Sequence, residues 1–194
     1  MMRVEMKKTA LIAMLVAAAA LLAVAAARAA TTDTITVSAT VTGGSTLSVG
    51  PNGTPAFALT LNGVDQTATY TLPVIVVDAR GLATGGGWNL TVTSTQFTAG
   101  SGHTFPTTAS TITAVTTGCG TSSTCTLPTN SVPNSNLAVP AASVAPAAVK
   151  YLNAANATGL GTTNVNATVS VAVPSNVFAG TYTSTVTVSI VAGP

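Results

Sequence analysis

Apolar and polar residues alternate with a period of two along most of the chain after residue 33. The first run extends from Asp33 to Val41, where Ile35, Val37 and Ala39 alternate with threonine and serine. Similar alternation recurs at residues 57–61, 68–77, 88–93, 165–173 and 182–190. Successive side chains of a strand point to opposite faces of a sheet, so each run predicts a strand with one apolar face and one hydroxyl-lined face.

Turn-forming residues separate these runs. Asn62-Gly63 ends the second run and favours a tight turn, and Pro73 lies within the third run, where it predicts an edge strand or a bulge because proline cannot donate to a ladder. The best helix candidate, residues 147–157, is short and lacks a broad apolar stripe. The pattern predicts an all-β fold, a single antiparallel β-sandwich with Greek-key, Ig-like connections.

Composition supports the same fold class. Of the residues after position 29, 36 are threonine, a residue that is stiff at χ1 and suits a pleated, half-buried surface. Disorder is the alternative for a polar chain of low complexity, but the regular apolar alternation argues against it.

The first 29 residues have the features of a secretory signal peptide. Arg3, Lys7 and Lys8 precede an apolar run from residue 10 to 27, and Ala27-Arg28-Ala29 provides a small-x-small cleavage pattern. A retained membrane anchor is the alternative, although ten of the 18 apolar residues are alanine, which favours insertion less than leucine or isoleucine. We expect residues 1–29 to be removed and residues 30–194 to form one exported domain.

Removal of the leader changes the charge. The whole chain has a net charge of +2, but residues 30–194 hold Arg80 and Lys150 against Asp33, Asp65 and Asp78, which leaves −1. Nucleic-acid binding requires clustered cations, and so does electrostatic attraction to an anionic membrane. We therefore expect neither nucleic acid nor, after cleavage, a membrane as a partner.

The residues that carry chemistry are few. Cys119 and Cys125 are the two cysteines of an exported chain and predict a local disulfide. His103 lies in a loop-like stretch far in sequence from any second metal ligand, so no metal or other cofactor is expected. Asp78 and Arg80 predict a local ion pair rather than an acid and base, and we expect no enzymatic activity.

Two segments resemble a known family. Residues 78–93 run from a glycine-rich turn into Trp88-Asn89-Leu90, and residues 173–190 contain Ala179-Gly-Thr-Tyr182-Thr before Val188-Ser-Ile190. Together they resemble the WxL domain of Gram-positive surface proteins, in which a second Trp-x-Leu ends the distal segment. Here Val188-Ser189-Ile190 stands in that place, so the distal Trp is missing. The resemblance implies a location at the bacterial cell surface and non-covalent attachment to peptidoglycan or another surface polymer, with Trp88 and Leu90 in the binding motif.

Several alternatives remain open at this stage. Trp88 is either a core anchor or an exposed binding aromatic, and the Tyr182 hydroxyl is expected to bond to a nearby backbone carbonyl. Besides a wall-binding domain, the chain could be a structural subunit of a surface fibre or layer that self-assembles by strand addition through residues 33–41. A carbohydrate-binding module is a third hypothesis, with Phe105 as the exposed aromatic.

Overall fold

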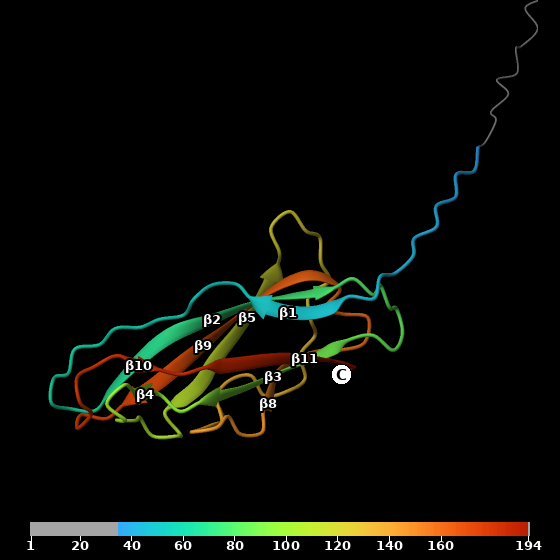
Figure 1. The fold of residues 1–194 in the computed structure, drawn as a ribbon. Helices are drawn as coiled ribbons and strands as arrows, with labels where there is room; N and C mark the ends of the chain where they lie inside the picture. The colour runs from blue at the N-terminus through green and yellow to red at the C-terminus, as the bar shows by residue number, and fades with distance from the viewer. Residues whose placement is uncertain (1–34, 194) are drawn as a thin grey trace, which may run out of the picture. The chain divides into compact units, whose positions relative to one another are not determined.

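The computed structural model describes residues 35–193, and every strand in it lies after residue 46. Contacts divide the chain at Thr40/Val41 into two units, each described by itself. Residues 35–40 of the first unit are exposed and form no strand. The strands of the second unit (Figure 1) are β1 Leu47–Pro51, β2 Gln66–Asp78, β3 Trp88–Thr95, β4 Thr98–Ala99, β5 Ser110–Cys119, β6 Leu137–Ala138, β7 Ala141–Ala142, β8 Val149–Ala154, β9 Gly161–Val173, β10 Tyr182–Thr183 and β11 Val186–Ala192.

The larger sheet has the strand order β1-β2-β9-β5-β6. Its centre is the antiparallel pair of β2 and β9, which are 13 residues each and stay in register from Gln66↔Val173 to Asp78↔Gly161. Their side chains alternate between buried and more exposed positions, as the period of two predicts. One apolar face of this sheet therefore covers the core.

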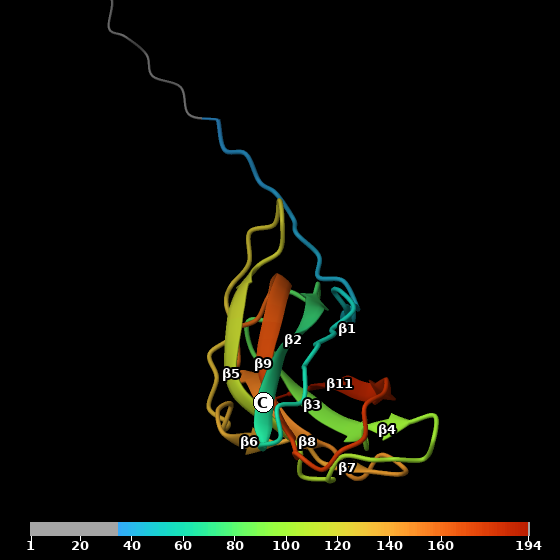
Figure 2. The ribbon, with the colours of Figure 1, turned by 90° about the vertical axis from the view of Figure 1, so that its left-hand side faces the viewer.

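The smaller sheet is built around β3, which pairs antiparallel with β11 on one side and β8 on the other. The short strand β7 adds a two-residue parallel pairing to the end of β3, and β10 pairs with β4 in a separate two-stranded ladder. Figure 2 shows β1, β2, β9 and β5 in one layer and β11, β3 and β8 in the other. The all-β sandwich expected from the sequence is confirmed.

A single core joins the two layers. Val76, Val165 and Val169 from the larger sheet pack in it with Trp88 and Tyr151 from the smaller one, each at most 1% exposed. Burial of these apolar side chains supplies the main favourable term in folding, because few charged groups are present to contribute otherwise.

Pro73 shows how the larger sheet tolerates an imino acid. It pairs with Asn166 of β9 without a break in register, so no bulge forms there. On its other side, the last pairing with β1 is Pro51↔Val74, and Pro73 comes just beyond it. β2 is therefore at the edge of the sheet only where β1 does not reach it, and Pro73 lies at that point.

Four predicted elements differ from the structure. The run of residues 182–190, predicted as one strand, is divided into β10, which pairs with β4, and β11, which pairs with β3. The described run of residues 35–41 forms no strand. Phe57 and Leu59 are half-buried and alternate with exposed neighbours, but residues 57–61 make no ladder. The weak helix candidate at residues 147–157 instead contains β8, which pairs with β3 and has its last four residues, 151–154, buried.

The proposed leader, residues 1–29, lies outside the described residues. Among residues 35–193, no helix is long and apolar enough to cross a membrane.

Candidate functional site

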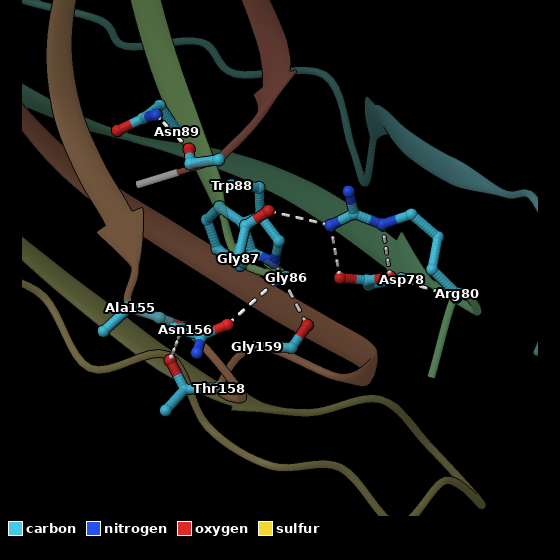
Figure 3. Close-up of polar contacts among 11 residues, drawn as sticks. Asp78, Arg80, Gly86, Gly87, Trp88, Asn89, Ala155, Asn156, Thr158 and Gly159 are labelled. Atoms are coloured by element: carbon cyan, nitrogen blue, oxygen red, sulfur yellow. Dashed lines mark hydrogen bonds and ion pairs between the residues drawn. The ribbon is translucent and has the colours of Figure 1, made fainter. Parts of the chain in front are cut away.

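Trp88 and Leu90 lie in the interior, at the start of the central strand of the smaller sheet. Both are 0% exposed, and β11 and β8 flank them. The indole N–H of Trp88 donates to the carbonyl oxygen of Gly159 at 3.1 Å, so its polar group is satisfied without water (Figure 3). Of the two alternatives for Trp88, the structure shows the core anchor. Binding of a wall polymer by these two residues stays a prediction, and neither offers surface for direct contact.

The glycine-rich turn before Trp88 is held by an ion pair. Arg80 donates to both carboxylate oxygens of Asp78, at 2.9 Å from Nε and 2.8 Å from Nη2, and Nη2 also donates to the carbonyl oxygen of Gly87 at 2.8 Å (Figure 3). Burial of Asp78 acts to raise its pKa, but hydrogen bonds and the positive charge of Arg80 outweigh burial and hold that pKa below its ordinary value. The local ion pair expected from the sequence is therefore present, and it fixes the turn.

A second set of contacts fixes the same turn from the loop after β8. The backbone N–H of Gly86 donates to Oδ1 of Asn156 at 2.9 Å (Figure 3). Gly87 has a φ of +98°, and a Cβ there would lie 2.5 Å from the carbonyl oxygen of Ala154. Glycine is thus required at position 87 by both backbone conformation and space.

The distal segment that resembles the family motif lies beside the proximal one. Ile190 of β11 pairs with Leu90 of β3, and Val188 pairs with Val92. Both β11 side chains are half-buried, while Ser189 between them is exposed. The two segments, about 100 residues apart in sequence, therefore form neighbouring strands of one sheet.

A groove of about 850 Å³ opens at the end of the sandwich near β10 and β4. Its walls come from residues 55–61 on one side and residues 177–184 on the other. Six aromatic side chains line it: Phe57, Tyr70, Phe97, Phe105, Phe178 and Tyr182. No Lys, Arg, Asp or Glu side chain is among its lining residues.

Five of the aromatic rings that line this groove contact one another in a row. Phe57 stacks on Tyr70 and meets Phe97 edge-on, with ring centroids 6.1 and 5.9 Å apart. Phe97 then contacts Phe105, and Phe105 stacks on Tyr182 at 4.3 Å. Such pairs contribute stability beyond the burial of their apolar surface area, so these rings are held in fixed positions along the groove.

Phe178, rather than Phe105, is the exposed aromatic of this region. Phe105 is 4% exposed, so the expectation that it is the exposed loop aromatic is wrong: its ring fills the space between Phe97 and Tyr182. Phe178 is 63% exposed and stacks on His103, with centroids 4.0 Å apart. A large exposed aromatic on the rim of an aromatic groove is typical of a binding surface.

The rim that carries Phe178 is held in place by polar contacts. The hydroxyl of Tyr182 donates to the carbonyl oxygen of Phe178 at 3.0 Å, which confirms the bond expected from the sequence. The backbone N–H of Ser175 donates to the carboxylate of Asp65 at 2.8 Å, and this bond lowers the pKa of Asp65. Hydrogen bonds at Ser175 and at Phe178 therefore fix the loop between β9 and β10.

A second cavity lies along the side of the sandwich. Its volume is about 510 Å³, and it lies between Val49 of β1 and Val188 of β11. It shares Pro55, Ser184 and Val186 with the walls of the first cavity, so the two are neighbours. We call the first cavity the aromatic groove and the second the β11 groove.

Comparison with known families decides the assignment. The family model described as "WxL domain surface cell wall-binding" matches residues 52–194. The chain belongs to the WxL family. No curated protein and no solved structure matched the chain.

The matched segment of this WxL domain covers β2 to β11 and both motif regions. The resemblance drawn from residues 78–93 and 173–190 is therefore confirmed. The family is described as a wall-binding one, which agrees with the expectation of a surface protein that binds the cell wall. It is a binding family by description rather than a catalytic one.

The disulfide of the WxL domain is local. Cys119 and Cys125 are bonded, as the sequence predicts, with Cα atoms 5.4 Å apart. The loop they close is joined to the start of β9 by the backbone N–H groups of Gly120 and Thr126, which donate to Thr162 and Leu160. Across residues 35–193, no three His, Cys, Asp or Glu residues gather where a metal could bind.

Sequence reasoning missed Phe178, which the structure makes the most accessible aromatic of the groove. It lies between Pro174 and Gly180 in a turn-rich segment, where Val177, Phe178 and Ala179 form a short apolar run. That contrast is a usable signal, since a large apolar side chain in a turn-rich segment is often exposed for contact with a partner.

Proposed function

We propose that this WxL domain attaches an exported, non-catalytic protein to the bacterial cell wall by non-covalent binding of peptidoglycan glycan in the aromatic groove. The observation that carries the proposal is the groove itself, in which a wall-binding family member presents six aromatic rings and no charged side chain. Its volume of about 850 Å³ is within the range of ligand sites, roughly 300–1,000 Å³.

The chemistry of the groove suits a neutral sugar chain. A sugar ring has apolar C–H faces that pack on aromatic rings and hydroxyls that exchange hydrogen bonds. Phe178 and Tyr182 supply ring surface, and Thr181, Thr183 and Ser184 supply hydroxyl groups from the same wall. These groups bind without any charge on either partner.

The same composition argues against an anionic wall polymer as the ligand. Phosphate-rich chains are held by lysine and arginine. Within residues 35–193, Arg80 is paired with Asp78, and Lys150 is exposed on β8, which contributes nothing to the groove. The glycan strand is therefore the component of the wall that the groove fits.

Trp88 and Leu90 support this function from the core. Leu90 pairs with Ile190, and the same pair of strands continues to Val186, which lines the groove. The motif thereby positions β11 and the segment before it, and it does so without contacting the ligand.

A pelleting experiment tests the proposal. The protein recovered after export is mixed with purified cell walls and centrifuged, and we expect it in the pellet. Phe178→Ala removes exposed ring surface and should weaken binding about tenfold, the equivalent of about 1.4 kcal/mol. Val144→Ala is the matched control, because Val144 is 80% exposed and lies outside both cavities.

Two outcomes would overturn the proposal. Complete recovery of the wild-type protein in the supernatant excludes wall binding. Equal pelleting of Phe178→Ala and Val144→Ala excludes the aromatic groove as the site.

The choice of a neutral ligand has its own test. At about 1 M NaCl, where the Debye length is near 3 Å, binding of a charged polymer falls steeply and binding of a glycan does not. We expect pelleting to persist at this salt concentration and to be competed by soluble glycan fragments. Loss of binding in salt would assign the site to an anionic polymer instead.

A further inference from the structure

Residues 35–41 have the pattern of a strand but no sheet to join. Ile35, Val37 and Val41 are 88%, 87% and 93% exposed, and Thr36, Ser38 and Thr40 alternate with the apolar positions. Such alternation is typical of a strand in a sheet with one buried face. When the strand is unpaired, its large aliphatic side chains are exposed to water. The segment therefore lacks the surface that its sequence is patterned to cover.

The edge strand β11 offers such a surface. It pairs with β3 along its whole length, from Val186↔Ser94 to Ala192↔Trp88, and within residues 35–193 no strand pairs with its other edge. Figure 2 shows it at the margin of its layer. Its sequence, Val-Thr-Val-Ser-Ile-Val-Ala, holds no proline, glycine or charge, and its register with β3 has no bulge.

The other edges of the sandwich carry features that hinder pairing. β1 contains Gly50 and ends at Pro51, and β5 pairs at one end with β6 and has a register irregularity in its ladder with β9 between Ile112 and Ala114. The outer edge of β8 is covered by residues 129–131, which bond to Asn153 and Ala155. Natural sheets blunt exposed edges with prolines, bulges and covering loops. β11 has no proline and no bulge, and β1 of the larger sheet lies beside it across the β11 groove.

The two segments also match in length and in pattern. Residues 35–41 and β11 are seven residues each, about 23 Å when extended. On β11, Val186, Val188 and Ile190 are half-buried and face the core, while Thr187 and Ser189 are exposed. A strand added beside β11 would place Ile35, Val37, Ala39 and Val41 on the apolar side, next to the β11 groove, and its hydroxyls on the wet side.

We propose that residues 35–41 of one copy add as a strand to the free edge of β11 in a second copy. Donor and acceptor are different surfaces of the same chain, so the contact is head-to-tail and propagates unless it closes into a ring. Backbone hydrogen bonds supply much of the affinity, and the four apolar side chains set the register. The proposal rests on the strand pattern and on the β11 edge rather than on glycan binding, although Val186 of β11 also lines the aromatic groove.

Substitutions on the two faces of the donor segment test the proposal. The protein recovered after export is examined at high concentration by sedimentation velocity and negative-stain microscopy. Wild-type protein should assemble into linear polymers, and Ile35→Asp/Val37→Asp should lose them, because two carboxylates would be buried without partners. Thr36→Asp/Ser38→Asp is the matched control: it carries the same charge on the solvent face and should still assemble.

Folding does not confound this comparison, because all four positions are fully exposed in the single chain. A circular dichroism melt of each variant should superimpose on that of the wild type. Hydrogen exchange then locates the acceptor, with added protection on assembly expected at residues 186–192.

Three results would overturn the proposal: a wild-type protein that stays monomeric, assembly unaffected by Ile35→Asp/Val37→Asp, or new protection at β1 or β5 in place of β11.

Discussion

The indole N–H of Trp88 donates to the carbonyl oxygen of Gly159 at 3.1 Å, and a Cβ at Gly159 would lie 2.5 Å from that same indole nitrogen. The close approach of ring and backbone is what buries Trp88 completely. It also joins the start of β3 to the loop between β8 and β9. The tryptophan of the WxL motif in this protein is thus a structural anchor whose partner must be glycine.

Gly159→Ala should therefore destabilise the protein strongly. Gly159 has a φ of +70°, which costs an alanine about 1 kcal/mol, and the new methyl group would also strike Trp88 and Ala154. We expect a loss of about 3 kcal/mol in the free energy of unfolding, measured by urea titration with Trp88 fluorescence as the probe. Gly100→Ala is the control, since nothing lies within 4 Å of a Cβ there, and it should change stability by less than about 0.5 kcal/mol.

Trp88→Phe separates packing from hydrogen bonding. The smaller ring leaves a void and removes the donor to the Gly159 carbonyl, so we expect a loss of about 2–3 kcal/mol in the free energy of unfolding. Circular dichroism during urea unfolding measures it. Wall pelleting of the folded variant should equal that of the wild type, because Trp88 has no exposed surface. Selective loss of pelleting with unchanged stability would contradict the anchor role.

How far the sequence predicts this molecule depends on the range of the interaction. The strands at residues 66–78 and 161–173 follow from local alternation, because each buries one face. The strand at residues 88–95 also follows from its sequence pattern, although both of its faces are largely buried. The same rule fails for residues 35–41 and 57–61, since alternation does not reveal whether a neighbouring strand is available. Pairing is a long-range property that a single run of residues does not encode.

The candidate site divides in a similar way. The Asp78–Arg80 pair, the disulfide and the Tyr182 bond join residues at most six positions apart, and all were predictable. The aromatic groove joins Phe57, Phe97 and Phe178, which are tens of residues apart, and only the fold brings them together. The position of Phe105 in a loop predicts that it is exposed, but tertiary packing turns its ring inward.

Acid should destabilise the domain through Asp78. Its pKa in the folded state is below the ordinary value of about 3.9, so its contribution to stability is complete above that value and is lost as the pH falls through the folded-state pKa. We expect the free energy of unfolding to be flat from about pH 5 to 8 and to fall below about pH 4. Urea titrations at each pH measure this.

Asp78→Asn should reduce that acid slope, at a large cost in stability at neutral pH because Arg80 would lose its partner. Asp65→Asn is the comparison. Its pKa is also lowered, by the Ser175 N–H, but the group is exposed and its effect should be small. An unchanged slope in Asp78→Asn would contradict the assignment.

The Cys119–Cys125 disulfide should contribute little. It closes a loop of six residue steps, for which the entropic model gives at most about 2.4 kcal/mol. Cys119→Ser/Cys125→Ser should therefore fold, with a urea midpoint only modestly lowered and wall pelleting unchanged, since the loop does not line the aromatic groove. Failure of the double variant to fold would show that the loop does more than staple the end of β5.

Alkali should destabilise the domain through its buried tyrosines. Burial raises the pKa of Tyr70 to about 12 and raises that of Tyr151 as well, whereas in the unfolded chain both ionise near 10. A folded-state pKa above the unfolded one gives stability that is complete below about pH 10 and is lost as the pH rises toward the folded-state pKa. Absorbance of tyrosinate near 295 nm should therefore show Tyr70 and Tyr151 ionising together with unfolding rather than before it. Tyr70→Phe, which keeps the ring stacked on Phe57, should weaken the alkaline loss of stability without harming the fold at neutral pH. Titration of Tyr70 and Tyr151 near pH 10 in folded protein would contradict their burial.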